Sequence, residues 1–581
     1  MGWSAEPQSQ RNRGLTVEGL LYVAIFVLAL LLRLAALGRW PLLDQEAALA
    51  LNAWRFARGL APTLRGHSPL LFHANSVLFF LSGGSDTLAR AVSVAFGSAL
   101  VLVPYGLRTY LGRVGALAAA CMLAMSPTLV YFSWAVDGSI VVAFCGLALV
   151  ALWVGALEGR PSVPVWVVVP LLTLALVAGP TAYSLLATVG TFLLLLQLLA
   201  RFGRGQEATE MWHKVWQQWR AERAAWWWGL ATAGILILGL VFAFGYNPSG
   251  LQMTLDQLGQ WLGGLEWLNT PQWYRVPLIL LIYEPLPLLV GLAGLVANRR
   301  RGDLISVWLR YSFAFGLLLS LFPGYRPPSQ ALLTLLPLIL AGAGAIQWLW
   351  DTLAEAVRRP LLWVLFAVSL VAAASVFIHL VGYLSMPSSH YLLRMLALVI
   401  LVVAAHAFIW TLAGPEVPAR AAMLALLSLL VLCWVRAEVR LNYQRGRDPV
   451  EPMVAVATSP DVLALADQAA ELSSHVAGDA RVLSWHIDER LEVPLGWYLR
   501  HFESVQYFRK LPLDLAEGGV IAPVEAGGPS DYVGQRFGLR SAWTAGSASL
   551  TDWLGWWSAK RLTLAGQRVD EEVVLWVKPR L

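Results

Sequence analysis

The strongest constraint on the fold of this chain is a long series of apolar runs, most of them about 20 residues in length. A run of that length crosses the hydrocarbon core of a bilayer as a helix. Of the 581 residues, 58% are hydrophobic and only 13% are charged, whereas a soluble protein carries about 25% charged residues. The sequence therefore predicts a polytopic α-helical membrane protein with about 13 spans. The runs cover 17–37, 88–105, 114–131, 139–157, 163–177, 182–199, 227–244, 276–297, 361–381 and 421–435, and three more end near residues 322, 350 and 412.

Basic residues in the connecting loops set the expected orientation. Arg11 and Arg13 precede the first run, and Arg299 to Arg301 follow the eighth. Because Lys and Arg accumulate in cytoplasmic loops, the N-terminus is predicted to lie in the cytoplasm. An odd number of spans then places the region after Arg440 outside the cell. The net charge of +6 is explained by these loops, so we expect membrane lipids and no nucleic acid as partners. The predicted location is the plasma membrane.

Composition changes after residue 440 and divides the chain in two. Residues 1–440 form the expected transmembrane domain, with a first outer loop at 38–87. Residues 441–581 alternate between strand-like and helix-like stretches, which predicts an extracytoplasmic α/β domain. Its expected strands are 453–457, 481–485, 504–508, 519–521 and 572–577, with a helix from Ser459 to Val476. No catalytic pattern is visible in this part, which we interpret as a cap or a recognition surface.

Two carboxylates, Asp44 and Glu46, follow the first span directly. Acidic residues at the end of a membrane span must be solvated, paired or functional. They could catalyse a reaction at the outer membrane surface. They could also be structural, with Asp44 as the N-cap and Glu46 in the first turn of a helix that starts near Ala47. His67, later in the same loop, is either a substrate ligand or a solvated side chain.

Four further residues are candidate substrate-binding groups. Asp137 lies at the outer end of the third span and could instead cap the fourth. Glu284 lies inside the eighth span, where a carboxylate is costly unless it is paired or faces a cavity. Tyr325 and Arg326 belong to an outer turn, and a guanidinium there suits phosphate recognition. Snorkelling to the membrane interface is the alternative for Arg326.

In their order along the chain, these features resemble the GT-C class of membrane glycosyltransferases. The features are the acidic pair, His67 two residues before Pro69, and Ser126-Pro127 ahead of an outer Asp. The protein O-mannosyltransferase and aminoarabinose-transferase branch is the most similar. Within it, the segments 282–287, 458–462 and 494–500 resemble the Agl-type flippase-activity-associated family.

The resemblance implies a mannosyltransferase-like enzyme that takes a sugar from a polyprenyl-phosphate carrier. The acceptor would be a glycan, lipid or protein at the outer face. By position Asp44 matches the family's catalytic base, but the chain reads Asp-Gln-Glu where the family has adjacent Asp and Glu, so Glu46 is an equal candidate. An Arg that often stands at the position of Trp134 is missing. Some relatives use a divalent metal and others do not, and this sequence is compatible with both.

A non-catalytic accessory or translocation protein for lipid-linked sugars is the alternative function. A transporter usually places ionisable groups near the bilayer centre, on broken helices. Here most candidate residues lie at the outer ends of spans, which favours the enzyme.

Overall fold

The structure, a computed structural model, describes most of the chain. The described residues are 16–63, 66–158, 165–202, 210, 213–214, 217, 220–221, 223–263, 274–297, 303–321, 327–353, 358–454, 456–510, 518–545, 552, 555–557 and 566–579.

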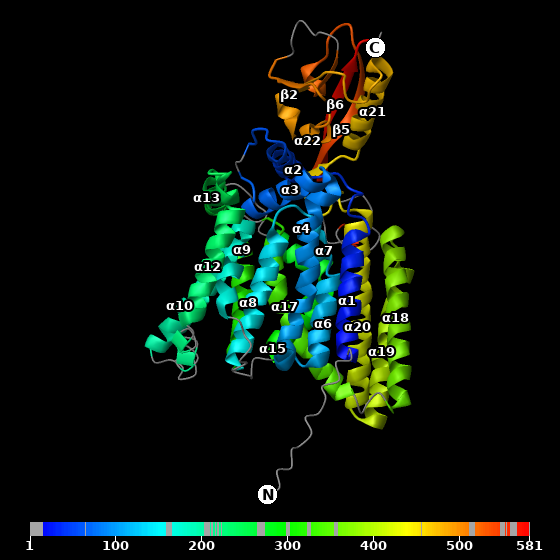
Figure 1. The fold of residues 1–581 in the computed structure, drawn as a ribbon. Coiled ribbons are helices and arrows are strands. Elements are labelled where there is room, and N and C mark those ends of the chain that lie inside the picture. The colour runs from blue at the N-terminus through cyan, green and yellow to red at the C-terminus, as the bar shows by residue number, and fades with distance from the viewer. Residues whose placement is uncertain are drawn as a thin grey trace.

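A bundle of long helices carries a small β-sheet domain at one end, the end at which α2, α3 and α13 also lie (Figure 1). Within the described residues, ten helices are long and apolar enough to cross a membrane, or up to twelve if each bent pair counts as one span. The predicted polytopic helical fold with a C-terminal α/β domain is therefore confirmed. The expected span at 163–177 is formed in part by α9, which has only 11 residues and is too short to cross alone. The bundle helices are α1 (Val17–Leu34), α4 (Asp86–Ala99), α5 (Arg108–Leu111), α6 (Arg113–Met125), α7 (Pro127–Ser133), α8 (Ser139–Leu157), α9 (Val168–Ala178), α10 (Thr181–Arg201), α12 (Arg223–Leu240), α14 (Arg275–Tyr283), α15 (Pro285–Ala297), α16 (Leu304–Leu321), α17 (Gln330–Leu353), α18 (Pro360–Ser385), α19 (Ser389–Ala413) and α20 (Glu416–Glu438).

Two of the runs that the sequence predicts as continuous spans are broken in the structure. Helices α6 and α7 bend by 55° at Ser126, and α14 and α15 bend by 102° at Glu284. Each break falls on a residue that precedes a proline, where the helical conformation is disfavoured. The hydroxyl of Ser126 and the amide of Thr128 donate hydrogen bonds to the Glu284 carboxylate, so the two breaks lie against each other.

The first outer loop folds into two short helices, α2 (Asp44–Ala57) and α3 (Pro69–Ser82). Helix α3 begins on a Ser68 side-chain cap followed by a proline at its first position, a favourable start. The apolar face of α2 packs on α3 and on Trp497, which belongs to the C-terminal domain. Helix α13 (Gly250–Gly263) adds to the same layer.

The C-terminal domain is one six-stranded sheet in the order β1-β5-β6-β4-β2-β3. The predicted strands at 504–508, 519–521 and 572–577 match β3 (Val505–Phe508), β4 (Gly519–Pro523) and β6 (Gly566–Val577). Those at 453–457 and 481–485 were placed too early, because β1 covers Val456–Thr458 and β2 covers Trp485–Asp488. The helix α21 (Asp461–Ala477) covers the sheet, and α22 (Glu492–Tyr498) follows β2. The long strand β5 (Val533–Ala545) was not predicted, because its glycines, arginines and serine give a weak strand pattern.

Helix α22 rests on the first outer loop through buried hydrogen bonds. The Trp497 indole and the Tyr498 hydroxyl both donate to Asp86, over 2.7 Å and 3.0 Å. The Tyr498 oxygen in turn accepts from the backbone amide of Leu42 at 2.7 Å. The sheet domain is therefore held against the residues that lead into α2.

Candidate active site

A buried carboxylate at the start of α2 forms the centre of the candidate site. Glu46 is only 4% exposed. Its Oε2 lies 3.0 Å from Nη2 of Arg447 and 3.6 Å from Nη2 of Arg90. The backbone amides of Leu43 and Val136 donate to its two oxygens at 2.9 Å and 3.1 Å. Burial alone would raise the pKa of Glu46, but the two guanidinium groups and the amides hold it below its ordinary value.

The Glu46 carboxylate also stabilises the start of helix α2. The N-cap residue is Leu43, and the Glu46 side chain reaches back to its amide. Asp44 is thus not the N-cap that the structural interpretation of the sequence proposed. It is the first helical residue, where its charge still favours the helix dipole.

Arg90, from the first turns of α4, holds the backbone that precedes α2. One of its Nη atoms donates to the carbonyls of Leu37 and Trp40, at 2.6 Å and 3.0 Å, and the other donates to Pro41. Its side chain is 2% exposed. A guanidinium that is always charged is rarely buried in this way unless it is paired or functional.

A small cleft opens beside Glu46. It is lined by Trp40, Glu46, Arg90, Tyr131, Trp134, Ala135, Gly446 and Arg447. Two cations and one carboxylate leave this wall with a net positive charge. The indole Nε1 of Trp40 and the Nε of Arg90 are buried without a hydrogen-bond partner among the described residues. Because unpaired buried donors are costly, the cavity is suited to an anion that accepts hydrogen bonds.

Asp44 points to the C-terminal domain and not to this cavity's arginines. Its Oδ2 forms an ion pair with Nε of Arg540 on β5. Its Oδ1 is buried and has no hydrogen-bond partner within the described part of the chain. Burial raises the pKa of Asp44 above its ordinary value, and the Arg540 charge only partly opposes that rise. Both oxygens of Glu46 accept hydrogen bonds, so Asp44 is the carboxylate of the two that keeps an oxygen available for a proton.

Asp137 lies next to the Glu46 pocket, in the turn between α7 and α8. Its Oδ1 accepts from the amide of Ser139, the first residue of α8, at 2.9 Å, although the N-cap residue of that helix is Gly138. Burial, with a smaller contribution from the Glu46 charge, raises the pKa of Asp137 to about 6. The preceding residue, Val136, donates to Glu46. The structure thus brings Asp137 and Glu46 together, as neighbours across one peptide segment.

His67 lies on another side of α2. Its Nε2 is 3.0 Å from the amide nitrogen of Asn52, and Gln257 of α13 approaches its carbonyl. Burial lowers the pKa of His67 to about 4, so the ring is neutral at physiological pH. Among the described contacts of His67 there is none to Asp44 or Glu46.

Glu284 lies deep in the bundle, 0% exposed. It accepts hydrogen bonds from Ser126, Thr128 and, at 2.9 Å, the indole of Trp434 on α20. These contacts join three segments of the bundle and leave the carboxylate well satisfied. Its described surroundings are those of a cross-link between helices.

The predicted outer turn with Tyr325 and Arg326 lies outside the described residues. The functional candidates that sequence reasoning missed are Arg90 and Arg447. The sequence did mark Arg90, because an ionisable residue at the start of an apolar run is by default a candidate functional residue. It did not mark Arg447, which stands in the polar stretch that follows the last predicted span.

The residues present are not arranged as a metal site. Asp44 and Glu46 face different cations, Arg540 for the first and Arg90 and Arg447 for the second. Over the described ranges, no group of three His, Cys, Asp or Glu side chains is placed to hold a metal ion.

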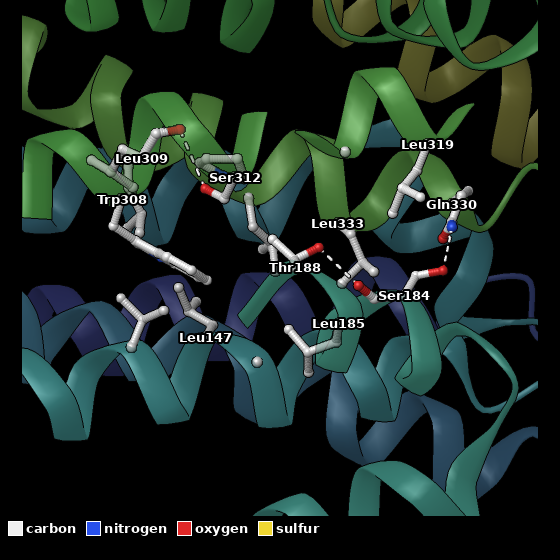
Figure 2. A pocket seen from close by; sticks show the side chains of 16 residues that line it. Leu147, Ser184, Leu185, Thr188, Trp308, Leu309, Ser312, Leu319, Gln330 and Leu333 are labelled. Carbon is white, nitrogen blue, oxygen red and sulfur yellow. Dashed lines mark hydrogen bonds between the residues drawn. The ribbon is translucent and has the colours of Figure 1, made fainter. Parts of the chain in front are cut away.

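A second cavity lies inside the bundle. Figure 2 shows it between α8, α10, α16 and α17, with Trp308, Leu147, Leu185 and Leu333 on its walls. Polar groups are few, and Gln330 donates to Ser184 at one end. The walls are those of an apolar chamber with a small polar rim.

Comparison with known proteins adds the fold. No family model matches the sequence, and no curated protein matches it. The apo structure of ArnT from Cupriavidus metallidurans is similar at a TM-score of 0.50 and 15% identity, over 95% of this chain and 97% of that one. The structure of the same protein bound to undecaprenyl phosphate is similar at 0.50 and 15%, over 84% and 86%. The oligosaccharyltransferase AglB from Archaeoglobus fulgidus, in complex with an inhibitory peptide and a dolichol-phosphate, gives 0.44 and 11%, over 83% and 63%. The likeness to ArnT is one of fold, and this chain has the fold of the GT-C membrane glycosyltransferases.

Proposed function

We propose that this chain is a glycosyltransferase that moves a sugar from a polyprenyl-phosphate carrier to an acceptor at the extracytoplasmic face. The observation that carries the proposal is the positively charged cavity at the start of α2, with Arg90 and Arg447 on its wall. Helix α2, whose Glu46 lines this cavity, lies at the end of the bundle where the sheet domain stands (Figure 1). ArnT, which shares the fold, has been crystallised with undecaprenyl phosphate.

The cavity suits the phosphate of such a carrier. Arg447 donates one hydrogen bond to Glu46, and its side chain is 7% exposed. The Nε of Arg90 and the indole of Trp40 are unpaired buried donors. Guanidinium groups match phosphate oxygens geometrically, and burial strengthens the attraction. Glu46 keeps the two arginines together and in this account does not react.

Asp44 is the proposed base. It would take the proton from the acceptor hydroxyl, whose oxygen then attacks the anomeric carbon of the sugar. The bond between that carbon and the phosphate oxygen breaks, and the phosphate leaves with the electron pair. Arg90 and Arg447 would stabilise the charge that develops on it. A single base is sufficient because a phosphate leaving group needs little acid assistance.

The apolar chamber of Figure 2 would hold part of the prenyl chain. Leucine side chains and Trp308 line it, and apolar walls with few polar groups suit a hydrocarbon ligand. Its polar end is formed by Gln330 and Ser184. Arg326, shortly before Gln330 in the sequence, remains a proposed second phosphate ligand, and Tyr325, His67, Asp137 and Glu284 remain proposed substrate contacts. A mannose-like sugar remains the proposed group that is transferred.

The test is transfer by the purified protein with a panel of polyprenyl-phosphate sugars. Asp44→Asn should lower the rate by roughly 10²–10⁴, the usual contribution of a positioned base, without loss of thermal stability. Glu46→Gln is the matched control, because it also removes one charge at constant shape. It should leave two buried arginines short of a partner and lower stability by about 3–5 kcal/mol.

The same panel separates the enzyme from its alternative. If Asp44→Asn and wild type transfer sugar equally well, Asp44 is not the base. If the wild type binds carriers but transfers none of the sugars, the non-catalytic accessory or translocation function becomes the better interpretation.

A further inference from the structure

The structure joins the proposed base to the C-terminal domain through one side chain, Arg540. Strand β5 carries Arg540 to the start of α2, where its Nε pairs with the Asp44 carboxylate. The Arg540 side chain is 21% exposed and that of Asp44 is 33% exposed, so this pair is partly shielded from water. Surface ion pairs contribute little, whereas a shielded pair fixes both of its members.

The other nitrogens of Arg540 are also bound. Nη1 donates to Glu571 of β6 at 3.0 Å. Nη2 donates to the carbonyl of Val493, near the start of α22. The guanidinium is therefore oriented by two hydrogen bonds and by its ion pair with Asp44, a contact that lacks hydrogen-bond geometry. A rigid planar fork of this kind positions a carboxylate, which a flexible ammonium group does not.

Arg540 lies at an irregularity of strand β5. The register with β6 shifts between Gly538 and Arg540, so Gly538 faces Glu572 and Arg540 faces Glu571. Leu539, which lies between them, is fully buried in the core of the domain. Bulges and similar irregularities change the direction of a side chain and are frequent beside active sites.

We propose that Arg540 is a positioning residue for Asp44, so that the C-terminal domain contributes directly to the candidate active site. The inference rests on the proposed function in that Asp44 is taken as the base. Arg540 holds Oδ2 and leaves the unpaired Oδ1 free to accept a proton from the acceptor. The domain is then a required part of the catalytic unit and not only a cover over the outer face.

Charge and geometry have separable effects in this arrangement. The charged groups that act on the Asp44 carboxylate from the neighbouring strands are Arg540 of β5 and Glu571 of β6. The first lowers the pKa of Asp44 and the second raises it. Loss of the Arg540 charge therefore raises the pKa of Asp44 further. Because the base must be ionised, the acid limb of the pH–rate profile should move to higher pH.

The experiment compares Arg540→Gln, Arg540→Lys and a control, using the full chain in nanodiscs and the donor that the wild type uses. Arg540→Gln should lower the rate at neutral pH by about tenfold to a hundredfold and move the acid limb upward by about one to three pH units. Arg540→Lys should restore the acid limb, because the charge is kept, but only part of the rate.

The control is Glu492→Gln, which breaks the 2.9 Å ion pair between α22 and Arg55 of α2 without touching Asp44. It loosens the same interface and should leave the pH–rate profile unchanged. If Arg540→Gln behaves like Glu492→Gln in both rate and profile, the positioning role is wrong.

A second measurement does not depend on transfer. Carbodiimides react with protonated carboxyl groups, so the pH dependence of labelling at Asp44, read by mass spectrometry, follows its protonation. In Arg540→Gln, labelling should persist to higher pH than in the wild type. An upward shift in a protein that transfers no sugar would mean that the pairing stands and the proposed function fails. Active protein with unshifted labelling would overturn the positioning role alone.

Discussion

Two carboxylates that are neighbours in sequence have separate environments. Glu46 pairs with Arg90 of the transmembrane domain and with Arg447, just after that domain, whereas Asp44 pairs with Arg540 of the sheet. On a helix, residues two apart point in different directions, which the sequence alone already indicates. Which direction leads to which partner depends on segments hundreds of positions away, and no local pattern contains that information.

At the residue scale, Asp137 offers a pH-dependent prediction. Its folded-state pKa of about 6 exceeds the ordinary value of about 3.9. Between these values the folded protein holds a proton that the unfolded chain lacks, so wild-type stability falls as pH rises through this window and stays reduced above it. Asp137→Asn keeps an oxygen for the Ser139 amide and has no charge to bury. Its melting temperature should exceed that of wild type at pH 7.5, and the difference should vanish near pH 4.

Activity assays of the same variant test whether Asp137 also contacts the substrate. A more stable protein with reduced transfer would support a substrate contact, since functional sites often trade stability for activity. A stability difference that is the same at every pH would contradict the burial of a charge at this position.

At the element scale, the two helix breaks explain Glu284. The residue stands where α14 ends, and its oxygens accept hydrogen bonds from the α6–α7 break and from α20. Hydrophobicity along the run 276–297 does not indicate the 102° bend. Pro285 marks the position of this break, as Pro127 does for the break between α6 and α7. Hydrophobicity predicts that such a segment enters the membrane, and proline marks a probable interruption. The direction of the chain after the interruption depends on tertiary packing.

Glu284→Gln should destabilise the fold. Glutamine has one acceptor oxygen and one NH₂ group, whereas Glu284 receives donors on both of its oxygens. An NH₂ group placed against a donor loses that hydrogen bond, at a cost of about 1–3 kcal/mol. The check is a thermal unfolding curve in detergent, together with the KM for the donor. A raised KM at unchanged stability would instead support the substrate contact proposed from the sequence.

At the scale of the whole molecule, the sequence predicts the architecture well and the site only in part. Apolar length alone marks nearly all of the bundle helices, because the bilayer imposes a minimum span. Asp44 and Glu46 stand out because charges are rare beside spans. Arg447 does not, since it is an ordinary residue of a polar segment until the chain folds back on Glu46. Strand β5 was also missed, and with it Arg540.

Orientation is the prediction at this scale. The arginine-rich loop at 299–301 predicts a cytoplasmic N-terminus and an external sheet domain. Alkaline phosphatase fused after Val577 should be active, because it folds only outside the cytoplasm, and the same reporter inserted at Arg301 should be silent. The reverse pattern would place the charged cavity on the cytoplasmic side and exclude an extracytoplasmic transfer.

The strand order has a consequence for how the protein is made. Strand β6, the last of the six in sequence, lies between β5 and β4 in the middle of the sheet, and it supplies the Glu571 that holds Arg540. The sheet cannot close until β6 has left the ribosome, whereas Asp44 is synthesised near the beginning. Until β6 has been synthesised, the Asp44 carboxylate lacks an Arg540 held in place by Glu571. A nascent or truncated chain that lacks β6 would therefore sit in the membrane with Asp44 not yet held by the sheet domain.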